Sequence, residues 1–200
     1  MVFRRVHSYF LTTLLIHLLN GSAWCESPPP ANEEFVNVTG GAFRLPEPDA
    51  ATAVVLLFIG HDCPISNGYA KEIGRLCEKY AAQKIAFCVV YADADLGADA
   101  ARKHAKDYGF PCPALLDPNM TLALRVGATV KPEAAVLSAK GELVYRGRID
   151  DRHIDFGKRR EQVTSHDLRD ALEAVLAGKP VITPRTKAIG CDIDLPEKTK

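Results

Sequence analysis

The ten residues FIGHDCPISN, at positions 58–67, decide the fold. They end a continuous apolar run, residues 53–59, whose length and Val/Leu content are typical of a strand buried on both faces of a sheet. Beyond them apolar residues recur every three or four positions, which predicts a helix over 64–82. A buried strand followed by a glycine turn and a helix begins a βαβ unit, whose crossover is right-handed.

Further along the chain the same signals continue in the order strand, helix, helix, hairpin and helix. They are predicted over residues 85–91, 96–106, 118–126, 133–146 and 168–176. The last helix has Thr164 or Ser165 as its N-cap and Gly178 just after its end. We therefore expect an α/β fold with a central mixed sheet and helices on both faces.

The composition fits one globular domain. The chain has 200 residues, 47% of them hydrophobic, with 25 Lys and Arg against 25 Asp and Glu. Without net positive charge there is no basic excess to neutralise a phosphate backbone, so nucleic acid is not an expected partner.

The amino terminus is typical of an export signal. Arg4 and Arg5 precede an apolar stretch at 9–19, which is too short for a membrane-spanning helix of about 20 residues. We expect residues 1–23 to be a signal peptide, with a lipid anchor at Cys25 as an alternative start of the mature chain. The protein is then periplasmic or secreted and does not span the membrane.

The remaining chain divides into three parts. A proline-rich linker at 24–34 leads into a domain at 35–178, and a tail at 179–200 carries Cys191. Outside the cytosol a cysteine is oxidised, paired, metal-bound or kept reduced by a dedicated donor, so each cysteine is weighed on its own.

Cys63 occupies a position with chemical consequences. It stands in the first turn of the predicted helix, where backbone N–H groups and the helix dipole favour the nucleophilic thiolate. Pro64 suits that turn, and the Ser66 hydroxyl can face the sulfur. Asp62 opposes a thiolate unless it caps the helix, so the direction of the pKa shift stays open. An inert, buried cysteine is the alternative.

This arrangement resembles the thioredoxin-like redoxins, a superfamily of exported thiol:disulfide oxidoreductases and peroxiredoxins. The resemblance lies in the strand, the short turn, Cys63 with Pro64 at a helix start, and Val130-Lys131-Pro132 before a hairpin, and it covers residues 35–148. It implies a thioredoxin-like fold, Cys63 as the nucleophile, and a cis bond at Pro132 facing it. Because cis X-Pro bonds are rare, this bond is a specific check.

Three departures from the family patterns limit what the resemblance implies. Ser66 stands where the CxxC pattern has its second cysteine, so a local disulfide is excluded. Leu56 and Gly60 replace the proline and the threonine or serine that polarise a peroxide in peroxiredoxins. Asn67 replaces the second cysteine of the CxxxC copper chaperones. A second sulfur ligand or resolving thiol must come from elsewhere.

The other cysteines differ in whether they are expected to reach Cys63. Cys77 and Cys88 lie within predicted apolar faces and are expected in the core. Cys112, between two prolines, is expected to serve a rigid connection rather than the site. Cys191 lies in a tail that the basic fold does not require. Our hypothesis is that it folds back and forms a disulfide with Cys63, with a free tail thiol as the alternative.

The charged segment at 146–161 and the histidines offer weaker candidates. The simplest interpretation of the segment at 146–161 is a solvated loop with surface ion pairs. A sharper hypothesis places Arg146, Arg148 or Arg152 beside Cys63, or against a redox partner. No two histidines have ligand spacing, so no metal site and no cofactor are predicted.

Together these observations predict an exported redoxin in which Cys63 is the catalytic nucleophile, assisted by Ser66, Pro132 and Cys191. The reaction is thiol–disulfide exchange or the reduction of a small peroxide, and both begin with attack by the thiolate. Expected partners are protein thiols or disulfides and an external thiol reductant. The alternative is a non-catalytic module, either a Cu(I) carrier or a partner-binding adaptor.

Overall fold

The computed structural model describes residues 34–45 and 50–196. The predicted signal peptide and the linker up to residue 33 lie outside this part of the chain. Among the described residues, no helix combines the length and apolarity that a membrane span requires.

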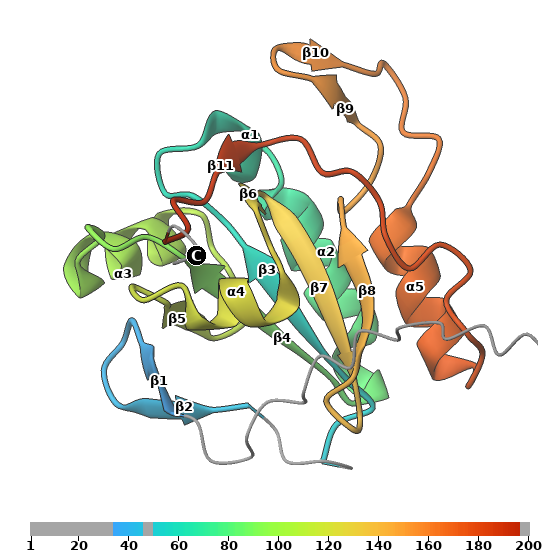
Figure 1. The fold of residues 1–200 in the computed structure, drawn as a ribbon, viewed down its shortest axis with the longest axis horizontal. Coiled ribbons are helices and arrows are strands. Elements are labelled where there is room, and N and C mark those ends of the chain that lie inside the picture. The colour runs from blue at the N-terminus through green and yellow to red at the C-terminus, as the bar shows by residue number, and fades with distance from the viewer. Residues whose placement is uncertain (1–33, 46–49, 197–200) are drawn as a thin grey trace, which may run out of the picture.

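A seven-stranded mixed sheet forms the centre of the fold (Figure 1), in the order β2-β1-β5-β4-β3-β7-β8. Its strands are β1 (Glu34–Asn37), β2 (Ala42–Arg44), β3 (Ala53–Phe58), β4 (Ile85–Tyr91), β5 (Ala114–Leu116), β7 (Glu133–Ser138) and β8 (Leu143–Gly147). The strands β3, β4 and β5 are parallel, and the other pairings are antiparallel. The expected mixed sheet is therefore confirmed, whereas the three shortest strands were not predicted because three or four residues carry no readable periodicity.

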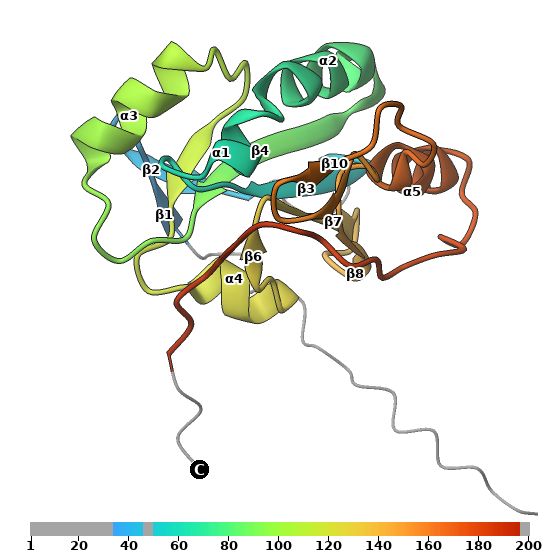
Figure 2. The same ribbon diagram turned by 90° about the horizontal axis from the view of Figure 1, so that it is seen from above.

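Helices cover both faces of the sheet, as expected (Figure 2). The helices α2 (Ala70–Tyr80), α3 (Ala98–Asp107) and α5 (Asp167–Leu176) lie on one face, and α4 (Thr121–Val126) lies on the other. All six side chains of β3 are buried: Val55 and Leu57 pack toward the first face, Leu56 and Phe58 toward the second. The strand thus contributes to two cores at once, which explains its unbroken apolar sequence.

The single helix predicted over 64–82 is wrong in one respect. It is divided into α1 (Pro64–Asn67) and α2, with a short 3₁₀ turn, η1 (Ala81–Gln83), after α2. Between the helices the Gly68 carbonyl accepts a hydrogen bond from Arg152, and the Tyr69 hydroxyl donates to Asp150 at 2.8 Å. These contacts with a distant loop hold the junction away from a continuous helical ladder.

The N-cap predicted for the last helix is also wrong. The N-cap of α5 is His166, because Thr164 is engaged elsewhere: its backbone N–H and its hydroxyl both donate to the buried carboxylate of Asp151. The end of this helix at Leu176, followed by Gly178 with φ of 64°, agrees with the prediction.

The carboxy-terminal tail returns across the molecule (Figure 1). Its strand β11 (Cys191–Asp192) pairs with β6 (Val130–Lys131), while β9 (His153–Asp155) and β10 (Lys158–Arg159) form a separate hairpin in the charged segment. In the tail the Thr186 hydroxyl accepts a hydrogen bond from the Arg148 N–H. It also forms a hydrogen bond with the Tyr145 hydroxyl. The tail is therefore anchored before it reaches β6.

This anchor depends on Gly147. A Cβ there would lie 2.1 Å from the Thr186 hydroxyl oxygen and 2.5 Å from the Thr186 carbonyl oxygen. We expect Gly147→Ala to lower the free energy of unfolding by about 2 kcal/mol, the usual scale for overpacking. The control is Gly74→Ala on α2, where a Cβ meets nothing within 4 Å. This substitution should raise the free energy of unfolding by about 0.5–1 kcal/mol. Urea denaturation measures the free energy of unfolding of both variants. Equal changes in the two would contradict the dependence of the tail anchor on Gly147.

Candidate functional site

Cys63 lies in a tight turn where β3 passes into α1. The Cys63 N–H points back to the Gly60 carbonyl, and the Gly60 N–H donates to the Ser66 hydroxyl at 3.1 Å. A Cβ on Gly60 would lie 3.0 Å from the Cβ of Cys63, a tight contact that a larger residue could make only if the cysteine shifted slightly. Cys63 itself is the N-cap of α1, so Asp62 does not cap the helix, and its side chain is exposed.

The predicted cis peptide bond is confirmed between Lys131 and Pro132. The Cys63 sulfur lies 3.3 Å from the carbonyl oxygen of Lys131, to which the protonated thiol donates. The two motifs that carried the resemblance are separated by 68 residues in the chain and meet at this contact.

The tail brings Cys191 to the same place. In the antiparallel pairing of β11 with β6, Cys191 is the partner of Lys131. Its thiol donates to the Cys63 sulfur, and the two sulfur atoms are 2.6 Å apart. Gly190 makes this approach sterically feasible, because a Cβ there would lie 2.2 Å from the Lys131 carbonyl oxygen. The tail is folded back, as the hypothesis for Cys191 expects, but Cys63 and Cys191 are both free thiols in this structure and are not joined by the predicted disulfide.

Cys191 also covers its partner. Only 1% of Cys63 is exposed, whereas Cys191 is half-buried. A nucleophile must be reachable by its substrate, and we expected this of the Cys63 sulfur; in this arrangement the expectation is wrong, because the tail lies between that sulfur and the solvent.

The two thiols differ in acidity. Burial raises the pKa of Cys63, but hydrogen bonds from the Cys191 thiol and from the backbone and hydroxyl of Ser66 outweigh it and lower the pKa. The pKa of Cys191 rises to about 11 through burial, its bond to Cys63 and the negative charges of Cys63 and Asp62. Cys63 is therefore the more acidic thiol of the pair, and Cys191 keeps its proton at neutral pH.

The cause of this shift differs from our prediction. A long helix starting at Cys63 was expected to stabilise the thiolate through its dipole, but α1 has only four residues. The stabilising donors are individual groups of Ser66 on α1 and of Cys191 on the tail, and Ser66 contributes as predicted.

The three arginines considered as neighbours of Cys63 have other partners. Arg146 pairs with Glu133, Arg148 forms two hydrogen bonds with Asp167, and Arg152 pairs with Asp150 and lies over the Tyr69 ring. Their roles here are structural, so that hypothesis receives no support. Within residues 34–45 and 50–196 no group of three or more His, Cys, Asp or Glu side chains is arranged to hold a metal ion.

The remaining described cysteines lie outside the site. The Cys77 and Cys112 thiols hydrogen-bond to each other, which raises the pKa of Cys77 and lowers that of Cys112. Cys88 is buried among apolar side chains, and burial raises its pKa to about 12. Cys112 therefore meets Cys77 and not Cys63.

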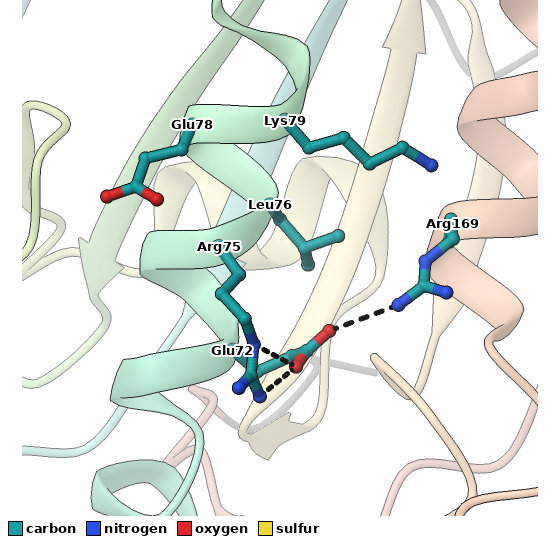
Figure 3. Close-up of a pocket in the computed structure, with 6 residues that line it drawn as sticks. All are labelled: Glu72, Arg75, Leu76, Glu78, Lys79 and Arg169. Carbon is teal, nitrogen blue, oxygen red and sulfur yellow. Dashed lines mark hydrogen bonds and ion pairs between the residues drawn. The ribbon is translucent and has the colours of Figure 1, made fainter.

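A surface hollow of about 650 Å³ lies between α2 and α5 (Figure 3). Glu72 accepts hydrogen bonds from Arg75 there and faces Arg169 across the gap at 3.5 Å. None of the six residues that line it is a cysteine. Arg75 and Arg169 both pair with Glu72, so the hollow is a polar seam between two helices and adds nothing to the thiol site.

One group of residues at the site was missed from the sequence. Asn67 accepts a hydrogen bond from His104 on α3 at 2.9 Å, and His104 in turn contacts the Tyr91 hydroxyl at 2.7 Å. From the sequence, Asn67 is of interest only because it replaces the second cysteine of the CxxxC pattern. Neither the spacing nor the composition around His104 signals that it reaches α1, since α3 had no predicted position relative to Cys63.

Solved structures from several bacteria resemble this one. A hypothetical protein from Sinorhizobium meliloti 1021 is 28% identical, with a TM-score of 0.71 over 83% of this chain and 92% of that one. An uncharacterized conserved protein from Geobacillus kaustophilus is 25% identical, with a TM-score of 0.70 over 87% and 95%. A secreted Mycobacterium tuberculosis disulfide oxidoreductase homologous to E. coli DsbE shares the fold at 15% identity, with a TM-score of 0.50 over 73% and 95%.

No curated protein matches the chain in sequence. Residues 27–162 match the Redoxin family, and this span is well over half of the chain. The fold around the cis-proline and the structural neighbours agree with that match. The chain belongs to the Redoxin family and has its thioredoxin-like fold.

Proposed function

We propose that the chain is an exported thiol–disulfide oxidoreductase whose redox couple is Cys63 and Cys191. The observation that carries the proposal is the 2.6 Å contact between the two sulfur atoms, across 128 residues of sequence. Membership of the Redoxin family supports thiol chemistry, and the export signal expected at residues 1–23 supports a location where disulfides persist.

The proposed reaction oxidises this pair and reduces a substrate disulfide. The Cys63 thiolate attacks one substrate sulfur, the substrate S–S bond breaks, and the other substrate sulfur leaves as a thiolate. Cys191 then attacks the Cys63 sulfur, forming the Cys63–Cys191 disulfide and releasing the second substrate thiolate. The protons given up by Cys63 and Cys191 end on the two substrate thiols. An external thiol reductant restores the dithiol.

The difference in pKa assigns these roles. At neutral pH the lowered pKa of Cys63 favours the attacking thiolate, whereas Cys191, with a pKa of about 11, keeps the proton that stabilises it. Once Cys63 is bound to substrate it no longer carries the negative charge that raises the pKa of Cys191. The resolving thiol therefore becomes easier to deprotonate at the stage that needs it.

Access to Cys63 requires that the end of the tail moves. Its described backbone contacts with the cis-proline segment are the two-residue pairing of β11 and β6 and one further hydrogen bond, from Ile193 to Thr129 at 2.9 Å. Opening breaks this short ladder and exposes Ile193, which is buried in the second core. It also leaves β6 unpaired, so substrate disulfides on extended protein segments, which can pair with a free strand, are the proposed class.

A small peroxide is a weaker candidate substrate. The thiolate would displace water from the peroxide to form a sulfenic acid, which Cys191 would convert to the same disulfide with loss of a second water. However, Gly60 offers no hydroxyl to polarise the peroxide, and the Ser66 hydroxyl is already engaged with Gly60 and Cys63. We therefore place exchange before peroxide reduction.

Binding without catalysis is the second candidate function. Two adjacent cysteine sulfurs, one of them a thiolate, are the soft ligands that Cu(I) prefers, and the pair could carry this ion as cargo. An adaptor that binds a partner through its loops would need neither thiol.

Counting free thiols separates these functions. After oxidation by glutathione disulfide, denatured parent protein should show two fewer free thiols, those of Cys63 and Cys191. In Cys63→Ala oxidation should no longer remove thiols of this pair, and the variant should no longer reduce protein disulfides. Cys88→Ala, which alters a buried cysteine outside the site, is the control that keeps both. An unreactive Cys63 together with tight Cu(I) binding would instead establish the carrier.

The pH dependence of Cys63 alkylation tests the source of its acidity. In the parent the rate of reaction with iodoacetamide should reach half its maximum at a lower pH than for an ordinary cysteine, because the pKa of Cys63 is lowered and the thiolate is the reactive form. Cys191→Ala removes a donor and should raise this midpoint. Cys191→Ser keeps a donor hydroxyl and should keep the midpoint low; equal midpoints in the two variants would contradict the assignment.

The fit of the tail against the cis-proline segment should set the stability of the disulfide. Gly190→Ala places a Cβ against the Lys131 carbonyl oxygen, and relieving that overlap costs about 1–3 kcal/mol. We expect the equilibrium constant for forming the Cys63–Cys191 disulfide against glutathione to fall about tenfold, since 1.4 kcal/mol corresponds to that factor. Gly74→Ala should leave the constant unchanged. An unchanged equilibrium constant in Gly190→Ala would contradict a role of Gly190 in the stability of the disulfide.

A further inference from the structure

A chain of hydrogen-bonded side chains runs from the core to the turn that holds Cys63. The Tyr91 hydroxyl, on β4, is 2.7 Å from Nδ1 of His104 on α3. His104 Nε2 is 2.9 Å from Oδ1 of Asn67, at the end of α1, and Asn67 Nδ2 donates to the His61 carbonyl at 3.3 Å. The chain thus links β4 and α3 to the turn before α1 through Asn67.

The partners fix the proton on the imidazole. Asn67 Oδ1 is an acceptor, since its amide nitrogen donates to the His61 carbonyl, so His104 Nε2 carries the hydrogen. Nδ1 is then unprotonated and accepts from the Tyr91 hydroxyl. Burial and the nearby His61 lower the pKa of His104, which agrees with a neutral ring, while Asp107 acts in the opposite direction.

Packing holds the ring in this orientation. His104 is 8% exposed and Tyr91 is fully buried. The Tyr91 ring meets the imidazole edge to face with the ring centroids 5.6 Å apart, and the centroid of the Tyr108 ring lies 4.5 Å from that of the imidazole. The imidazole therefore has little freedom to turn away from Asn67.

Asn67 acts on both sides of Cys63. Its backbone N–H donates to the Cys63 carbonyl at 3.0 Å, and its side chain donates to the carbonyl of His61, two residues before the cysteine. The turn is thus bound at two carbonyls by one residue, and the orientation of that residue's amide is set by His104.

We propose that His104 is a positioning residue for the thiol pair: through Asn67 it fixes the turn at residues 61–63 and so holds the Cys63 sulfur against Cys191. The inference rests on the proposed function, because it concerns the same disulfide. His104 makes no contact with either sulfur in the described structure; it acts through the backbone that carries one of them.

Two substitutions at His104 test this role in the full chain. Leucine fills the site without a donor, whereas the glutamine amide can present an N–H where Nε2 stands. For each variant we would measure the equilibrium constant of the Cys63–Cys191 disulfide against glutathione, and the melting temperature. We expect His104→Leu to lower the constant about tenfold, the scale of one or two lost hydrogen bonds, and His104→Gln to stay within about threefold of the parent.

The outcomes separate a positioning role from a structural one. If both variants lower the melting temperature but leave the constant at the parent value, His104 only stabilises the fold and the inference is overturned. If the parent itself forms no Cys63–Cys191 disulfide, the proposed function fails instead. Should His104→Leu not fold, Asn67→Ala removes the same link at a half-buried position. An unchanged constant in Asn67→Ala would also overturn the inference.

Discussion

The site depends on one pairing, that of the tail strand β11 with β6 beside the cis bond at Pro132. The Lys131 carbonyl beside that bond faces the Cys63 sulfur, and the pairing sets Cys191 opposite Lys131. Register in an antiparallel ladder places side chains on alternate faces, so a slip by one residue would turn Cys191 away. The absence of a side chain at Gly190 makes the close approach feasible.

This arrangement replaces a local dithiol by a distant one. In a CxxC turn both sulfurs belong to one helix start, whereas here Ser66 takes the second position and donates to the Cys63 thiolate. The second sulfur arrives with the tail, which is anchored at Gly147 through Thr186. The proposed redox chemistry is thereby coupled to the position of the tail, because the same cysteine covers Cys63 and, in the proposed reaction, forms a disulfide with it.

The sequence predicted those features that depend on local pattern or on a specific motif. The apolar runs of β3 and β4, the hairpin of β7 and β8 and the end of α5 all have clear periodicity or turn residues. The cis bond at Pro132 followed from the family resemblance and is confirmed. The position of Cys191 was one of two open alternatives, because nothing in a tail sequence states where it packs.

What was missed depends on contacts between distant segments. The break between α1 and α2 comes from Arg152 and Asp150, about 80 residues away, and could not be seen in the helical periodicity. The burial of Cys63 and the link from His104 to Asn67 likewise arise only once the tail and α3 are in place. Short strands such as β5 are supported by their neighbours rather than by their own three residues.

Disulfide mapping tests the central claim most directly. Purified protein is oxidised with glutathione disulfide, alkylated, digested with trypsin and analysed by tandem mass spectrometry. The account predicts a disulfide-linked pair of peptides, residues 45–71 with Cys63 and residues 188–198 with Cys191. Recovery of both peptides alkylated, or of Cys63 joined to any other cysteine of the chain, would contradict it.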